Sequence, residues 1–384
     1  MKKFIILLFP LAFMMSCQDF LDEPPKSQVS PDNFYQNIDQ ARAGVNAIYD
    51  ALQSLYSNGN NIITLGDIAG NGFHGDVTYN EHTVNPTDGI LSSFWTTSYD
   101  GINRANSAID NIPRAEGLES AKDALIGEAK YLRALFYFNL VRLFGDIPLM
   151  DHELTSLENA FPARSPIANV YSLIEADLVD AGNNLPNTQS DKGRATSPAA
   201  RALLAEVYLT LGDFVGAKTE AEKVMGLGMF DMWASYEDAF KVANENGKES
   251  IFEVQYHSGL GGLGNSKAFL LPDALTDLVA NGPVFRSYPV DEDLLNTYET
   301  GDQRKEVDAI TEMIVNGETV VLGDEPVSIK YIDESFTVNI QDSNNNWPLR
   351  RYSDVLLMYA EAENEVNGPT TAALDAVNMV RRRA

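Results

Sequence analysis

The segment that most limits the possible folds is a predicted helical hairpin at residues 197–226. Its sequence, SPAARALLAEVYLTLGDFVGAKTEAEKVMG, begins with Ser197 and Pro198 and has a turn signal at Gly212. Proline suits the first turn of a helix, and glycine favours the end of one. The apolar and small residues have the spacing of a tetratricopeptide repeat, at Leu204, Ala205, Tyr208, Ala217, Ala221 and Val224.

This spacing has a steric meaning. Ala205 and Ala217 allow the two helices to approach closely, and Tyr208 fills the space between neighbouring hairpins. Arg201 departs from the pattern, because the repeat favours an aromatic residue there. A second, longer match occupies residues 350–383, RRYSDVLLMYAEAENEVNGPTTAALDAVNMVRRR. Because one repeat cannot bury its apolar face alone, the two matches predict stacked helical hairpins.

Four further helices are predicted where apolar residues recur at three- and four-residue steps, in residues 30–56, 92–112, 120–144 and 167–186. We expect the first helix to begin at Ser30, with Pro31 at its first helical position. Ser120 and Asp123 have the spacing of a capping box at the start of the third. Gly145 is expected to end that helix.

Two loop-rich insertions interrupt the helices. Residues 58–90 contain six glycines and six asparagines, which break any helix. Residues 227–348 are rich in turn signals, with strand-like runs at 249–256 and 325–332. The predicted fold class is therefore mostly α, a tetratricopeptide-like helical hairpin scaffold with long loops and a few short strands.

The N-terminal residues have the layout of a bacterial lipoprotein signal. Two lysines precede an apolar stretch that is too short to span a membrane, and Ser16 stands just before Cys17, the single cysteine. We therefore predict a signal peptide at 1–16, a lipid anchor at Cys17, a tether at 17–31 and a helical domain at 32–384. The alternative is an ordinary secreted protein with an accidental cysteine.

Composition and motifs exclude several functions. Acidic residues outnumber basic ones 55 to 28, and the net charge of −27 disfavours nucleic acid as a partner. The glycine motif at 259–264 follows a strand-like run but does not open a helix, as a dinucleotide site requires. His74 and His82 share a loop but lack metal-ligand spacing. We predict no cofactor, metal site or catalytic residue; a glycosidase pair of carboxylates stays open, because so many carboxylates guarantee some neighbours.

The chain resembles the SusD and RagB family of outer-membrane nutrient-binding lipoproteins from Bacteroidetes. The resemblance rests on the cysteine followed by DFLD and on the motifs EAKYLRALFYFNLVRLFGDIPL, ARALLAEVYLTLGD and LRRYSDVLLMYAEAENE. It implies four tetratricopeptide-like helix pairs, loops that form a surface glycan site, and a SusC-like TonB-dependent barrel as partner. Acidic residues after the cysteine, at Asp19, Asp22 and Glu23, resemble the signal for the cell surface. Family members usually continue well past the final RRRA, so the chain is expected to be C-terminally short.

Glycan binding needs exposed aromatic faces beside polar groups that pair with hydroxyls. The candidates in predicted loops are Phe73, His74, Tyr79, Phe285, Arg286, Tyr288 and Trp347. Trp95 and Tyr99 lie four residues apart on an amphipathic helix and are expected to pack in the core, as is Trp233.

Two functions remain open at this point. The leading hypothesis is a surface lipoprotein, exposed on the outer membrane, that captures oligosaccharides and passes them to the transporter. The alternative is a peptide- or protein-binding lipoprotein of nutrient import, because tetratricopeptide arrays often bind peptides. Clustered loop aromatics would favour a glycan, and a deep groove lined by polar residues of helix faces would favour a peptide.

Overall fold

A computed structural model describes residues 34–57, 83–156, 160–259, 290, 292–315, 317–330 and 343–384. Within these ranges, the long helices form antiparallel hairpins, as predicted. The pairs, in chain order, are α1 (Ile38–Ser57) with α4 (Gly89–Asn111), α5 (Glu119–Phe144) with α6 (Ile167–Asn184), α7 (Ser197–Leu211) with α8 (Phe214–Gly226), and α11 (Tyr352–Asn367) with α12 (Thr371–Arg383).

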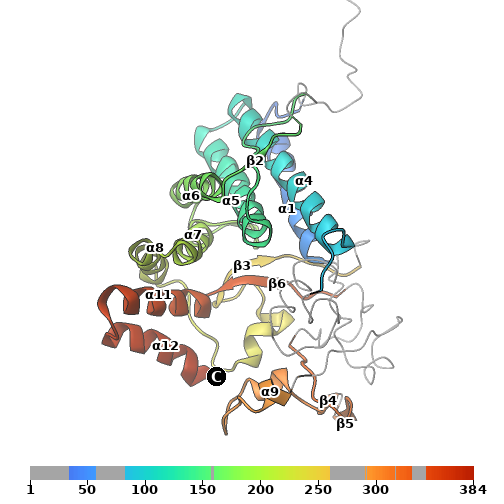
Figure 1. The fold of residues 1–384 in the computed structure, drawn as a ribbon, viewed down its shortest axis with the longest axis vertical. Helices are drawn as coiled ribbons and strands as arrows, with labels where there is room; N and C mark the ends of the chain where they lie inside the picture. Colours follow the sequence, from blue (N-terminus) through green and yellow to red (C-terminus); the bar gives the residue numbers. More distant parts are fainter. Residues whose placement is uncertain are drawn as a thin grey trace, which may run out of the picture.

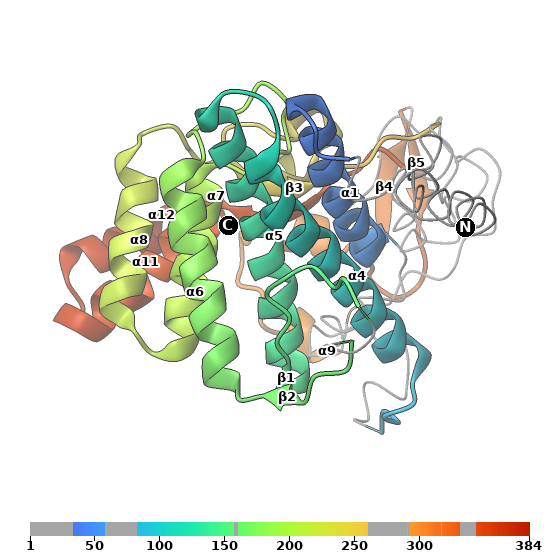
Figure 2. The same ribbon diagram turned by 90° about the horizontal axis from the view of Figure 1, so that it is seen from above.

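Consecutive hairpins pack against one another, through α4 and α5, α6 and α7, and α8 and α11 (Figure 1). Seen from above, α6 lies on one side of α5, and α1 and α4 lie on the other (Figure 2). Because α5 packs against α1, α4 and α6, it is buried nearly all round between Gly127 and Val141, and its buried residues include the charged Glu128 and Arg133. Its Tyr131, Phe136 and Tyr137 are among the largest fully buried side chains.

Three helix starts differ from those predicted, and α4 begins at Gly89 rather than at residue 92. Residues 34–37 are not helical, and α1 begins at Ile38, where the Asn37 side chain accepts a hydrogen bond from the Gln40 N–H at 3.0 Å. Helix α5 begins at Glu119, after Leu118, which caps it with no side-chain bond, so the predicted capping box is wrong. The predicted end is confirmed at Gly145, which has a φ of 71°.

The α7–α8 hairpin matches its predicted boundaries. Thr196 and Asp213 cap its two helices by accepting hydrogen bonds from the N–H groups of Ala199 and Gly216. Gly212 between them adopts a φ of 76°, a left-handed conformation that glycine adopts readily. The alanines of the repeat pattern, Ala205, Ala217 and Ala221, are fully buried.

The strands form three antiparallel pairs in the described part: β1 (Ile147–Pro148) with β2 (Arg164–Ser165), β3 (Ser250–Val254) with β6 (Trp347–Arg351), and β4 (Glu312–Val315) with β5 (Glu318–Val321). The first strand-like run became β3. In the second, Val327 forms an isolated bridge with Ile310 rather than a strand, because Pro326 lacks an N–H and weakens any ladder. Residues 331 and 332 of that run lie outside the described ranges.

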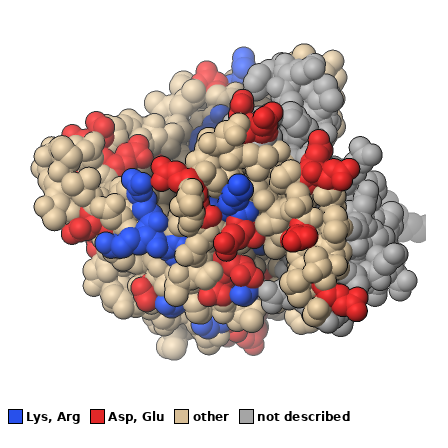
Figure 3. Space-filling view, turned by 90° about the horizontal axis from the view of Figure 1, so that it is seen from below, with Lys and Arg blue, Asp and Glu red and all other residues tan. Residues whose placement is uncertain are grey.

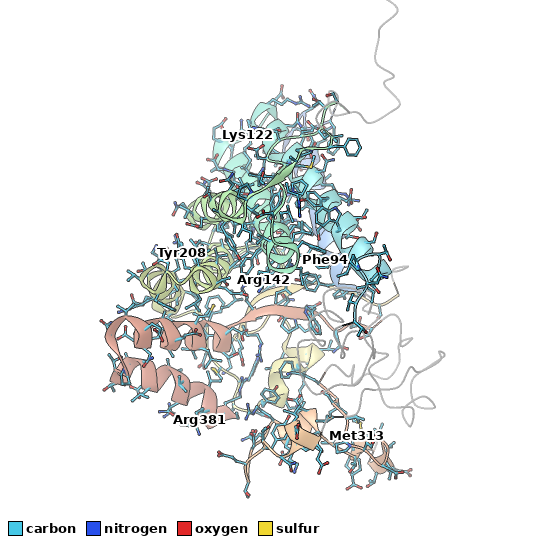
Figure 4. All side chains as sticks on the ribbon, viewed as in Figure 1. Phe94, Lys122, Arg142, Tyr208, Met313 and Arg381 are labelled. Atoms are coloured by element: carbon cyan, nitrogen blue, oxygen red, sulfur yellow. The ribbon has the colours of Figure 1, made fainter. Side chains whose placement is uncertain are left out.

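The β4–β5 hairpin lies far from the α5 end marked by Lys122 (Figure 4). Beside Lys122, the short helix η2 (Ile112–Arg114) follows α4. The other short elements are η4 (Glu237–Phe240), η5 (Val242–Asn244), α9 (Glu292–Leu295) and α10 (Lys305–Asp308). A second small core of Tyr236, Phe240 and Val307 lies between these elements. No helix in the described ranges is both long and apolar enough to cross a membrane.

The β3–β6 pair lies against the first helices of the hairpins. Strand β3 contacts α1 and α7, and β6 contacts α7 and α11. The ring of Phe252 in β3 packs edge-on against Tyr131 of α5, with ring centroids 4.9 Å apart. The two strands therefore cover the side of the scaffold formed by α1, α5, α7 and α11.

Candidate functional site

Most predicted site residues fall outside the described ranges. These are Cys17, three candidates in residues 58–82, and three in residues 260–289: Phe73, His74, Tyr79, Phe285, Arg286 and Tyr288. Trp347 is described; it is the first residue of β6, opposite Val254, and it is half-buried against the main core. The other predicted sites stay predictions.

Three of the chain segments that border undescribed ranges meet at one place: the end of α1, the end of β3 and the stretch before β6. The Gln53 side chain, one turn before the end of α1, donates from Nε2 to the carbonyl oxygen of Gln255 at 3.0 Å. The Tyr256 hydroxyl donates back to the carbonyl oxygen of Gln53, also at 3.0 Å. The end of α1 and the end of β3 are thus tied together before each chain segment leaves the scaffold.

Asn346 ties the stretch before β6 to the same place. Its Oδ1 accepts from the Tyr256 N–H at 2.9 Å. Its Nδ2 donates to Glu253 Oε2 at 3.0 Å and to Gln255 Oε1 at 3.1 Å. With only 5% of its surface exposed, Asn346 has its amide satisfied by protein partners rather than by water.

Two neighbouring contacts extend this arrangement. Asn246 and Gln255 form a reciprocal amide pair at 2.8 and 3.0 Å. Asn344 Oδ1 accepts from both the N–H and the hydroxyl of Ser258, at 3.0 and 2.8 Å. We call the whole set the amide junction: Gln53, Asn246, Glu253, Gln255, Tyr256, Ser258, Asn344 and Asn346.

Gly193, in the connection between α6 and α7, packs directly on the amide junction. It has a φ of 88°, and a Cβ placed on it would lie 2.2 Å from Gln255 Cγ. No side chain could occupy this position without displacing Gln255.

Burial changes the pKa of tyrosines at and near the amide junction. Burial raises the pKa of Tyr256 well above its ordinary value, so its hydroxyl keeps its proton and serves as a donor. Below the junction, Arg350 of β6 forms an ion pair with Glu206 of α7. Burial also raises the pKa of Tyr56, which accepts a hydrogen bond from Asn139 at 3.2 Å.

Chemically, the amide junction offers amide groups, the Tyr256 and Ser258 hydroxyls and the Glu253 carboxylate. The described ranges hold no group of three or more His, Cys, Asp or Glu that could bind a metal. Seen from below, basic side chains lie among acidic ones and form no continuous basic surface (Figure 3). This mixture agrees with the net charge of −27.

Trp347 was predicted in a loop but lies in β6, and its role as a ligand contact stays a prediction. Sequence reasoning did not identify the residues of the amide junction. The available signal was the run of three asparagines, Asn344 to Asn346, directly before the tryptophan. Trp95 packs on Phe144 with ring centroids 5.1 Å apart, and the Tyr99 hydroxyl donates to Pro148, so both pack as predicted. Trp233 is half-buried beneath Lys248, not buried in the main core as predicted.

The described helices place the chain in the class of proteins built on stacked tetratricopeptide-like hairpins. The chain belongs to the SusD/RagB family. Residues 19–209 match the family described as "Starch-binding associating with outer membrane", and residues 324–384 match the family described as "SusD family".

Known proteins resemble the whole chain. SusD-like protein P2 of Formosa agariphila is 29% identical over 417 residues, which cover 100% of this chain and 82% of that protein. A crystal structure of a SusD superfamily protein from Parabacteroides distasonis has a TM-score of 0.80 and 24% identity, covering 93% of this chain and 81% of that one. A solved laminarin binding SusD-like protein has a TM-score of 0.77 and 28% identity, covering 91% and 84%.

Proposed function

We propose that this protein is a glycan-binding lipoprotein of the outer membrane. It captures oligosaccharides at the cell surface and delivers them to a SusC-like TonB-dependent transporter, held on the membrane through Cys17. The observation that carries the proposal is the likeness to a laminarin binding SusD-like protein, which extends over 91% of this chain at 28% identity.

The residue types around the amide junction support a sugar ligand. Aromatic rings stack on the C–H faces of sugars, and amide groups pair with hydroxyls. The proposed ligand contacts are the candidate residues of the flanking segments, Phe73, His74, Tyr79, Phe285, Arg286 and Tyr288, together with Trp347. In the sequence, Asn344, Asn345 and Asn346 directly precede Trp347.

The arrangement of the sheet disfavours the peptide alternative. A peptide held by the hairpin array would need a groove along α1, α5, α7 and α11. Strands β3 and β6 pack on these helices, and Phe252 contacts Tyr131 there. The chain's own strands therefore occupy the position that a bound peptide would take.

Affinity electrophoresis tests the glycan proposal. The lipid-free chain from Gln18 onward is run in native gels that contain laminarin, xyloglucan, starch or a host glycan. We expect one polysaccharide to retard the protein, and Tyr79→Ala or Tyr288→Ala to abolish the retardation. Phe161→Ala is the matched control, because Phe161 is 90% exposed but lies beside β2, on another connection. A folded protein that no glycan retards would contradict the proposal.

Two further measurements test the remaining parts of the proposal. Release of reducing ends from any polysaccharide, above a heat-denatured control, would overturn the assignment as a binding protein without catalysis. Delivery predicts that the protein co-purifies with a TonB-dependent barrel, and that cells lacking it grow more slowly on the retarding glycan than on its monosaccharide.

A further inference from the structure

We propose that Asn346 is a positioning residue: its side chain fixes the relative arrangement of three chain segments beside Trp347, the described candidate for a ligand contact. The segments are the end of α1, the end of β3 and the stretch before β6. The inference rests on the proposed function for the identity of the ligand, and on the amide junction for everything else.

The backbone ladder alone does not hold these segments. Pairing between β3 and β6 is irregular on both sides of Phe252, and it ends at Val254 opposite Trp347. Two residues after Val254, the Tyr256 N–H donates to Asn346 Oδ1 at 2.9 Å. The amide therefore replaces the next rung of the ladder at the point where the strands separate.

The same amide reaches the third segment through Gln255. Asn346 Nδ2 donates to Gln255 Oε1, and the carbonyl oxygen of Gln255 accepts from Gln53 of α1. One hydrogen bond thus links Asn346 to β3, and a path of two hydrogen bonds through Gln255 links it to α1. Residues 91 to 202 positions apart in the chain are held by hydrogen bonds of buried and half-buried side chains, which gives them a defined geometry.

Glu253 explains why position 346 needs an amide side chain rather than a carboxylate. Its carboxylate is 7% exposed and accepts from Asn346 Nδ2 and from the N–H of Asn246. A carboxylate at position 346 would face Glu253, with Glu245 also bonded to the backbone N–H of residue 346. Two carboxylates this close disfavour full ionisation, so a proton shared between them restores a donor at low pH.

This property gives a reversible test with the variant Asn346→Asp. The probe is laminarin, and the readout is retardation in native gels at pH 7 and pH 5. We expect binding about tenfold weaker than wild type at pH 7, because a buried donor is lost. We expect recovery toward wild type at pH 5, where protonation of the introduced carboxyl returns the donor.

The matched control is Asn106→Asp. Asn106 is fully buried and makes a similar set of bonds, donating to the carbonyl oxygens of Met150 and His152 and accepting from Arg133. Its partners lie in α5 and in residues 150–152, away from the amide junction. We expect this variant to bind laminarin like wild type at both pH values, whatever its loss of stability. Wild-type affinity of Asn346→Asp at pH 7 would overturn the inference.

A second readout separates this inference from the proposed function. If wild type binds no glycan, the proposed function fails, but hydrogen exchange still tests the amide junction. Peptides that contain the N–H groups of Tyr256 and Ser258 should exchange faster in Asn346→Asp than in Asn106→Asp at pH 7, and this difference should shrink at pH 5. Equal exchange in the two variants would overturn the positioning role on its own.

Discussion

Arg201 occupies a position where tetratricopeptide repeats favour an aromatic side chain. Its guanidinium donates to the carbonyl oxygen of Gly182 at 2.9 Å and to Glu220 at 3.1 Å. One side chain of α7 therefore links the end of α6 to α8. The departure from the repeat pattern replaces an apolar contact by a polar one that serves the same purpose, the joining of neighbouring hairpins.

A second arginine carries a larger energetic role. Arg133 of α5 forms a buried bidentate pair with Asp177 of α6, with both N–O distances 2.8 Å. Removing one partner leaves a buried charge unpaired, so we expect Asp177→Ala to lower the free energy of unfolding by about 3–5 kcal/mol. Urea denaturation measures this change.

Asp180→Ala is the control for that prediction. Asp180 pairs with Lys130 between the same two helices, but the pair is partly exposed. Its loss should cost no more than about 1 kcal/mol. Equal effects of the two substitutions would show that the buried pair adds nothing beyond an ordinary ion pair.

At the scale of elements, the connection between α6 and α7 depends on a glycine. Gly193→Ala introduces strain at a φ of 88° and also a clash with Gln255. Gly212→Ala introduces similar strain at a φ of 76°, but a Cβ there meets no atom within 4 Å. We expect Gly212→Ala to destabilise the fold by about 1–2 kcal/mol and Gly193→Ala by more.

Thermal unfolding and laminarin retardation distinguish the two variants. Gly193→Ala should also weaken binding, because it displaces a member of the amide junction, and Gly212→Ala should leave binding unchanged. If Gly193→Ala is no worse than Gly212→Ala in either assay, then the close approach to Gln255 has no consequence.

The third and fourth hairpins are joined by an ion pair with a pH signature. Lys218 of α8 lies 2.6 Å from Glu363 of α11 and holds the pKa of that carboxyl below its ordinary value. A lowered folded-state pKa gives stability above the unfolded value of about 4.3, and this stability is lost as pH falls through the folded value. Glu363→Gln should therefore lower the Tm at pH 7 and have little effect near pH 3.

Salt provides the control for this ion pair. The difference in Tm between wild type and Glu363→Gln at pH 7 should shrink in about 1 M NaCl, because screening weakens charge pairs that water can reach. A difference that persists unchanged at low pH and in high salt would assign the effect to hydrogen bonds with Asn367 and Thr370 instead.

The sequence predicted these elements unevenly, for a physical reason. Helical periodicity is local, so α4, α5 and the α7–α8 hairpin could be placed from their own residues. Strand β6 was not predicted, because its pairing depends on β3, and nothing within WPLRR marks a partner. The bonds of Asn346 were equally invisible, since its partner Glu253 is 93 positions away.

The N-terminal starts of α1 and α5 could not be predicted exactly from the sequence. Both helices formed where periodicity placed them, but their predicted starts at Ser30 and Ser120 were wrong. At α1 the side chain of Asn37 competes for the capping role, and at α5 the helix begins without a side-chain cap. Capping residues are common, and the packing of the helix decides which of them is used.

At the scale of the whole molecule, membrane attachment is the feature that a single substitution tests most directly. We expect Cys17→Ser to prevent acylation, because serine cannot form the thioether to a lipid. Labelling of cells with radioactive palmitate should mark the wild type and not the variant, and the variant should move from the membrane fraction to the soluble one. Equal labelling of the two proteins would exclude Cys17 as the anchor.

The pairing of β3 with β6 also determines when the binding surface can exist. The hairpins α5–α6 and α7–α8 join neighbouring residues and can form early, whereas Asn346 and Glu253 must first close a loop of 93 positions. During synthesis, three hairpins emerge before β6 has been made. We expect the first three hairpins to fold before the amide junction, so that a nascent chain gains most of its helices before the strands β3 and β6 can pair.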